Sequence, residues 1–240
     1  MSHTGAPSPD APVDVRERGA TRDGVEQVMD RRLFMQLLAF EGDAHALADG
    51  LQARGIASVV YEDVNHPRGV GLLTWSEDPS HFVSVVRPAV NAVEGLRPRP
   101  ELSMLGRTYS TGYESDLEFW LLRRPVETAL HAGWDWAVWY PLRRVGAFNR
   151  LEGREQGAIL REHGQIGRAY GEADLAHDIR LACHGLDAND NEFVVGLVGP
   201  RLQPLSHVVQ AMRRTRQTAE FMEKMGPFFV GHAARRTAAR

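Results

Sequence analysis

Cysteine is nearly absent from this sequence, since Cys183 is the single one among 240 residues. One cysteine cannot form an internal disulfide, a multi-cysteine zinc site or an iron–sulfur site, which fits a reducing compartment. Because Cys183 lies in an apolar stretch, we expect it to be buried as a small hydrophobic side chain.

Long hydrophobic runs are absent as well. No apolar segment approaches the roughly 20 residues that span a bilayer. The N-terminal stretch has no hydrophobic signal region, and its acidic residues argue against a transit peptide. We therefore expect a cytoplasmic protein without a membrane span.

A surplus of positive charge is the third missing feature. The chain has 28 lysines and arginines against 31 aspartates and glutamates, a formal net charge of -3. This balance does not indicate a nucleic-acid partner. Residues 234–240 are locally basic, and we interpret them as a solvated tail. The hydrophobic fraction of 43% is typical of an ordinary globular protein.

Large apolar side chains are scarce in residues 1–29, which are rich in Pro, Ala, Gly and charge. Such a segment buries too little apolar surface to offset the entropy that is lost on ordering. We predict a disordered N-terminal extension over this range.

Residues 30–109 carry alternating patterns typical of strands and helices. Asp43 is a plausible N-cap for a helix whose apolar positions fall on one face. The expected elements are a strand over 33–40, a helix over 44–54, strands over 56–61 and 69–75, a helix over 76–94 and a strand over 102–109. The order β-α-β-β-α-β predicts a ferredoxin-like unit.

Residues 134–233 repeat this order after a linker over 110–133. The expected elements are a strand over 136–142, a helix over 154–169, strands over 178–185 and 193–198, a helix over 205–222 and a strand over 227–232. Two such halves can pair their sheets edge to edge and close a barrel, which removes exposed strand edges. The predicted fold class is α+β, with two ferredoxin-like halves in a dimeric α+β barrel type of subunit.

Four motifs occur in order in the second half. They are WYP, which ends in Pro141, then EHGQIGRAYG, GLD and GPFFVG. With the two repeated halves, they give the chain a resemblance to the chlorite dismutase family over residues 31–233, and within it to the HemQ-type coproheme decarboxylases. The resemblance implies a duplicated ferredoxin-like barrel, usually a homopentamer, that holds haem b or coproheme (iron coproporphyrin III) in the C-terminal half.

The resemblance also assigns roles to individual residues. His163 stands at the His of the family's helical EHG motif, which implies that it is the proximal ligand of the iron. By itself, a His on an apolar helix face is more often a core residue. Tyr140 stands at the Tyr of the YP motif, which in the decarboxylases forms a radical during catalysis. Phe148 takes a place where the decarboxylases usually have a Trp.

The carboxylates of a porphyrin need charge-assisted hydrogen bonds once they leave water. The resemblance places Arg213 and Thr218 near a propionate. The pairs Arg123–Arg124 and Arg143–Arg144 could supply more cations, although a solvated basic face is the simpler interpretation of at least one pair. Glu220 is a candidate to orient His163.

The distal side departs from the family. Chlorite dismutases have an Arg over the iron and many decarboxylases a Gln, at a position that falls on Asp178 in this sequence. Arg180 lies two residues further, on the same face of a strand, so it could also face the metal. A distal His that some relatives take from the segment before the YP motif falls on Arg123.

The favoured hypothesis is peroxide-dependent oxidative decarboxylation of coproheme to protohaem, with Tyr140 as the catalytic residue and hydrogen peroxide as co-substrate. A second hypothesis is chlorite decomposition or peroxidase chemistry, which needs a distal cation such as Arg180. A third is a haem-binding or haem-transfer protein without enzymatic activity.

Overall fold

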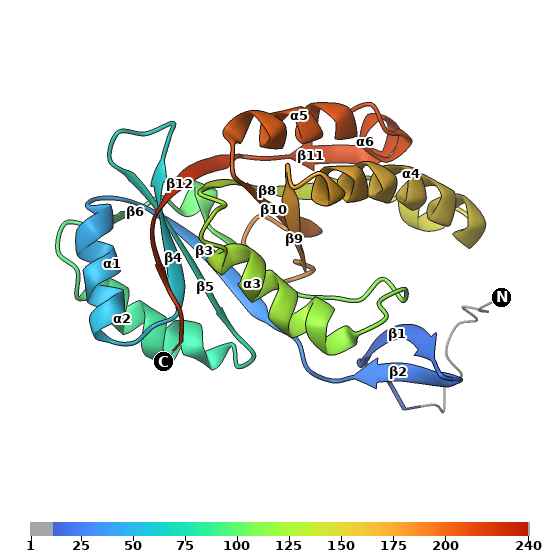
Figure 1. Cartoon of the computed structure of the whole chain (residues 1–240), viewed down its shortest axis with the longest axis horizontal. Helices are drawn as coiled ribbons and strands as arrows, with labels where there is room; N and C mark the ends of the chain where they lie inside the picture. Colours follow the sequence, from blue (N-terminus) through green and yellow to red (C-terminus); the bar gives the residue numbers. More distant parts are fainter. Residues whose placement is uncertain (1–11, 240) are drawn as a thin grey trace.

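The N-terminal half forms the first ferredoxin-like unit of the computed structural model, which describes residues 12–239 (Figure 1). Its elements are β3 (Phe34–Glu41), α1 (Ala44–Ala53), β4 (Ser58–Asp63), β5 (Gly69–Ser76), a π-helical turn (Phe82–Val86), α2 (Arg87–Asn91), β6 (Arg97–Pro98), a 3-10 turn (Pro100–Leu102) and β7 (Met104–Arg107). The strands are antiparallel in the order β7-β3-β5-β4. Asp43 caps α1 as predicted, because its side chain accepts hydrogen bonds from the N–H groups of His45 and Ala46.

The C-terminal half repeats the same order. Its elements are β8 (Trp136–Arg144), a 3-10 turn (Phe148–Arg150), α4 (Gly153–Glu172), β9 (His177–Ala182), β10 (Phe193–Gly199), α5 (Leu202–Met212), α6 (Arg216–Phe221), β11 (Met222–Met225) and β12 (Phe229–Thr237). The strand order β12-β8-β10-β9 matches that of the first half. This confirms the duplication predicted from the sequence.

The two sheets join at both edges. Strand β4 pairs with β12 from Ser58–Thr237 to Asp63–Gly231, and β7 meets β9 at Arg107–Ala182. With β8 bonded to both β10 and β12, the strands form a closed ring. The predicted barrel is therefore confirmed.

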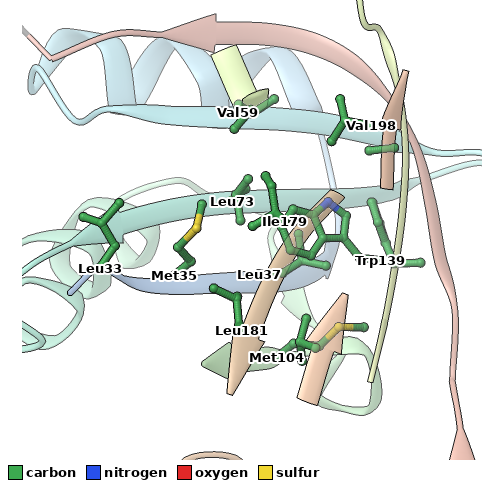
Figure 2. Packing of buried hydrophobic residues seen from close by; sticks show 14 of the residues in the cluster. Leu33, Met35, Leu37, Val59, Leu73, Met104, Trp139, Ile179, Leu181 and Val198 are labelled. Carbon is green, nitrogen blue, oxygen red and sulfur yellow. The ribbon is translucent and has the colours of Figure 1, made fainter. Parts of the chain in front are cut away.

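The barrel interior is filled by large apolar side chains from both halves. Figure 2 shows Met35 and Leu37 of β3 packed with Trp139 of β8 and Ile179 of β9, and all four are almost fully buried. Close packing depends on glycine at Gly196, where an added Cβ would lie 2.5 Å from the Trp139 ring. The interior is a packed core.

Helices cover the outside of each sheet. Helices α1 and α2 lie over the N-terminal sheet, and α4 and α5 over the C-terminal one (Figure 1). We call the region where α4 and α5 pack on the outward face of the C-terminal sheet the outer C-terminal layer. Its buried residues are Val138, Tyr140, Leu142, Ala176, Leu197, Leu205 and Val208.

The N-terminal extension is partly ordered. The prediction of disorder over 1–29 is wrong for Glu17–Met29, which form the hairpin of β1 (Glu17–Arg22) and β2 (Val25–Met29). Polar contacts hold this hairpin: the Gln27 amide donates to the Glu114 and Ser115 carbonyls. A prediction based on scarce apolar residues misses such contacts. Residues 1–11 lie outside the described part.

The predicted linker contains a helical segment, a π-helical turn (Phe119–Arg123) followed by α3 (Arg124–Leu130). It is held because Leu121 and Ala129 are buried in the barrel core. The predicted helix over 205–222 is in fact two helices, because the chain bends after Met212 and Thr215 caps α6.

The predicted solvated tail is also corrected. Residues 234–237 belong to β12, and Arg236 in this segment bonds to the Trp134 carbonyl at 2.8 Å and to Asp135 at 3.0 Å. Cys183 is buried as expected, and burial raises the pKa of its thiol to about 12. Across residues 12–239, no helix combines the length and apolar character that a bilayer crossing needs.

Candidate functional site

The outward face of the C-terminal sheet carries the three strand residues singled out in the sequence, Tyr140, Asp178 and Arg180. Tyr140 on β8 pairs with Val195 on β10, which in turn pairs with Arg180 on β9. Because side chains alternate along strands, Trp139 and Ile179 point into the barrel while these residues point outward. Asp178 lies on the same outward face, as the sequence predicts.

His163 faces this sheet from α4. It shares a helix face with Ile159, Ile166 and Tyr170, at the i, i+3 and i+4 spacing that places residues on one side. Its Nδ1 atom lies 3.3 Å from the hydroxyl oxygen of Thr215. Burial lowers the pKa of His163, and the positive charge of Arg180 lowers it further. The imidazole is therefore neutral near neutral pH.

Tyr140 is buried in the outer C-terminal layer, with 6% of its surface exposed. Its ring stacks on Phe228 with 4.7 Å between the centroids. Burial raises the pKa of the Tyr140 phenol, the charge of Asp178 raises it further, and Arg213 opposes both. The phenol keeps its proton, and its hydroxyl lies within the fields of both charged residues.

Asp178 lies between two guanidinium groups. Arg124 donates to the Asp178 side chain at 2.8 Å and to its carbonyl at 2.7 Å, and the Nε atom of Arg180 is 2.8 Å from the other carboxylate oxygen. Burial alone would raise the pKa of Asp178, but Arg180 and Arg124 outweigh it and lower the pKa. Arg124 also stacks over Trp120, 4.8 Å from the ring centre.

A second ion pair lies further along β8. Arg144 is held in a bidentate pair by Glu192, at 3.0 Å and 2.5 Å. Its guanidinium lies 4.2 Å from the ring centre of Phe148 and 4.8 Å from that of Phe193. Beside this pair is a polar cavity of about 180 Å³, lined by Arg143, Arg144, Asn149, His184, Asp190, Asn191 and Glu192.

A family model described as chlorite dismutase matches residues 68–234, which include Tyr140, His163 and Asp178 and nearly all of the C-terminal half. The chain belongs to the chlorite dismutase family. No curated protein sequence has a significant match to it.

Solved structures share this chlorite dismutase fold at low sequence identity. A candidate chlorite dismutase has a TM-score of 0.68 at 15% identity, with 85% of this chain and 96% of that chain covered. A haem-binding protein from Thermus thermophilus has a TM-score of 0.63 at 18% identity, covering 85% and 92%. A chlorite dismutase variant from Candidatus Nitrospira defluvii has a TM-score of 0.63 at 14% identity, covering 86% and 93%.

The other residues suggested by the resemblance to chlorite dismutases differ in burial. Phe148 is buried against Phe221 near α4, and Thr218 is half-buried with its hydroxyl 3.4 Å from that of Thr215. Arg213 and Arg123 are exposed. Arg123 is 3.7 Å from Asp116, so it is the neighbouring Arg124 that reaches Asp178.

Of the three histidines between Arg161 and Asp187, only His163 faces the outer C-terminal layer. His177 stacks on Trp134 with 3.6 Å between ring centroids and bonds to Asp174. His184 is exposed and contacts the edge of Phe193. The hypothesis that Glu220 orients His163 is wrong in this structure, because Glu220 is exposed and bonds to Arg216 at 2.9 Å.

Sequence reasoning missed Thr215 and Tyr109, and it named Arg124 only as a possible cation for a carboxylate. Thr215 is the hydrogen-bond partner of His163, and Arg124 is the partner of Asp178. Tyr109 lies 5.6 Å from Phe193 between ring centres; burial raises its pKa, and the charges of Arg180 and Arg144 oppose that effect. The capping pattern of Thr followed by a short helix was a usable signal for Thr215. Over residues 12–239, no three His, Cys, Asp or Glu side chains are grouped as a metal site.

Proposed function

We propose that this chlorite dismutase family protein binds an iron porphyrin against the outer C-terminal layer, with His163 as the axial ligand. The support is the family membership together with the geometry of His163, a neutral imidazole on a helix that faces apolar sheet residues. Family resemblance further suggests a homo-oligomer, a pentamer in most members.

The residues that are present fit such a group. The second ring nitrogen of His163 is engaged by Thr215, which leaves Nε2 as the ligating atom. Leu160, one turn before His163 on α4, is 44% exposed, and the Arg180 side chain is 43% exposed. A porphyrin would cover apolar surface at Leu160 and bring its carboxylates near arginines.

We propose that the reaction is the oxidative decarboxylation of coproheme. For each propionic acid group, one hydrogen peroxide is consumed and a vinyl group, carbon dioxide and two waters are formed. Bound iron would mediate the two-electron oxidation by peroxide. Tyr140 would first lose its phenolic hydrogen atom to that oxidant, and the resulting Tyr140 radical would take a hydrogen atom from the propionate chain. The second electron would pass to the iron as carbon dioxide leaves. The observation that carries this role is that Tyr140 is a protonated, buried phenol on the sheet face that is turned toward His163.

Arginines at both ends of the layer would hold the carboxylates of the substrate. Arg213 is exposed and close enough to Tyr140 to act on its pKa, which suits a group that presents a propionate to the phenol. Arg144 is already paired with the Glu192 carboxylate in a 10% exposed environment. A substrate carboxylate at Arg144 would therefore have to share or displace Glu192.

The test is a comparison of wild type with Tyr140→Phe after anaerobic titration with coproheme and addition of peroxide. Mass spectrometry should detect the three-propionate intermediate and protohaem for wild type, and unchanged coproheme for the variant. Tyr170→Phe is the matched control, because it removes a hydroxyl that bonds to His207 in the same layer. Turnover by Tyr140→Phe, or bleaching of coproheme by wild type without product, would refute the decarboxylase proposal.

Arg180 favours chlorite decomposition or peroxidase chemistry as the second candidate. The ion pair with Asp178 holds Arg180 on the sheet face that is turned toward His163, and 43% of the Arg180 side chain stays exposed. A guanidinium there can stabilise an oxyanion at the iron. Oxygen release on adding chlorite, lost in Arg180→Gln, would favour this candidate. If neither chlorite nor peroxide is consumed productively, a haem-binding role like that of the Thermus thermophilus protein follows.

A further inference from the structure

The hydroxyl of Thr215 has more than one neighbour. Its Oγ1 atom lies 2.8 Å from the Met212 carbonyl oxygen, 3.4 Å from the Thr218 hydroxyl and 3.3 Å from Nδ1 of His163. Thr215 is 1% exposed, so these contacts are made away from solvent. Each contact restricts where the single hydroxyl hydrogen can point.

A carbonyl oxygen can only accept a hydrogen bond, and the Met212 contact is the shortest of the three. The Thr215 hydrogen therefore points at Met212, one lone pair of Oγ1 accepts from the Thr218 N–H, and the other lone pair faces His163. An oxygen that presents a lone pair requires a donor at Nδ1. The ring of His163 must then carry a hydrogen on Nδ1.

We propose that Thr215 is a positioning residue that holds His163 in the tautomer protonated at Nδ1, so that Nε2 is free to bind iron. The part of this inference that concerns iron rests on the proposed function. The part that concerns the tautomer does not, because it depends only on contacts within the chain.

The local fold explains why Thr215 can hold this geometry. Thr215 is the N-cap of α6, where its side chain accepts a hydrogen bond from the Thr218 N–H. The bend after Met212 places Thr215 next to His163 of α4. A hydroxyl at an N-cap is fixed by the helix that it begins. The break between α5 and α6 thus supplies the partner of His163.

Three carboxylates of α4 and α6 bond to Arg216. The Arg216 side chain bonds to Glu155 and Glu220, each at 2.9 Å, and its backbone N–H donates to Glu162 at 3.1 Å. His163 therefore has a neutral acceptor instead of a charged one. A neutral acceptor raises the basicity of an axial imidazole less than a carboxylate does, so the ferrous state of bound iron is less disfavoured.

The first experiment uses the full chain without porphyrin. Solid-state NMR of protein labelled with ¹³C,¹⁵N-histidine, at mildly alkaline pH, reports which ring nitrogen of each histidine carries the hydrogen. We expect the Nδ1–H form for His163 in wild type and in Thr215→Ser, and the Nε2–H form in Thr215→Val, with His177 and His207 as internal controls. An Nε2–H form in wild type, or no change in Thr215→Val, would overturn the proposal.

The second experiment uses protein reconstituted with haem b. Thr215→Asp keeps an N-cap and places a carboxylate at Nδ1, so the reduction potential should fall and the iron–imidazole stretching frequency should rise, with Thr215→Ser like wild type. Thr215→Val should weaken haem binding by about 10-fold. Identical reduction potentials and stretching frequencies in all variants would overturn the inference that the residue at position 215 sets the basicity of the axial imidazole. If His163→Ala leaves ligation unchanged while the tautomer result holds, only the proposed function fails.

Discussion

The side chain of Arg124 reaches the carboxylate of Asp178 at 2.8 Å, although the two residues are 54 positions apart. Arg124 begins α3 in the segment between the halves, and Asp178 lies on β9 of the C-terminal half. This ion pair holds α3 against β9, the strand that carries Arg180. The position of Arg180 on the sheet face that is turned toward His163 therefore depends on the segment that connects the two halves.

Arg124→Gln tests this connection. The change removes a charge-assisted bond to Asp178 and the contact with Trp120, so we expect the free energy of unfolding to fall by about 1 kcal/mol. Arg123→Gln is the matched control, because the Arg123 side chain is 56% exposed and lies 3.7 Å from Asp116. Urea denaturation measures both. An equal loss in the two variants would mean that the Asp178 pair contributes nothing.

Asp178→Asn tests the electrostatics of the same group as a function of pH. Burial raises the pKa of Asp178, but Arg180 and Arg124 lower it below its ordinary value of 3.8. A lowered pKa stabilises the folded state above the unfolded pKa, and this contribution is lost as pH falls through the folded pKa. Wild type should therefore exceed Asp178→Asn in stability near neutral pH, with the difference shrinking below about pH 4. A difference that grows on acidification would mean that burial dominates.

The barrel could be predicted because its pattern is local and repeated. The strand around Leu37, the cap at Asp43 and the outward pairing of Asp178 with Arg180 all follow from periodicity that the sequence displays. The hairpin at Glu17–Met29 could not be predicted, because backbone carbonyls some 90 residues away hold Gln27.

The candidate site was predictable in part for a similar reason. Tyr140 and His163 stand in motifs, so their places followed once the fold was known. Arg124 and Thr215 depend on the exact phase of a helix and on a bend, which shift by one residue without changing the hydrophobic pattern. That single residue separates Arg123 from Arg124.

Two glycine substitutions separate packing from helix propensity. Gly196→Ala places a Cβ 2.5 Å from the Trp139 ring, so it should destabilise the barrel by about 1–3 kcal/mol. Gly164→Ala, in the middle of α4 with nothing within 4 Å of the added Cβ, should stabilise the protein by about 0.5–1 kcal/mol. Thermal unfolding of porphyrin-free protein measures both changes. Shifts of the same sign would contradict the packing argument.

His163→Ala tests the proposed axial ligand. The apolar surface and the arginines would still hold a porphyrin, so colour can persist while ligation is lost. The optical and magnetic spectra of the ferric complex should therefore lose the signature of an imidazole ligand. His177→Ala is the matched control, since His177 stacks on Trp134 and bonds to Asp174. Imidazole ligation that survives in His163→Ala would exclude this residue as the ligand.

Arg213→Ala distinguishes the carboxylates that react from those that persist. If Arg213 holds a propionate that is removed in turnover, the variant should weaken coproheme binding more than protohaem binding, by about 10-fold for one charge-assisted hydrogen bond. Arg214→Ala is the matched control, because this neighbour is also exposed but is absent from the charges that act on Tyr140. Equilibrium titrations with the two porphyrins give the ratio. Equal losses for both porphyrins would assign Arg213 to a propionate that remains in the product.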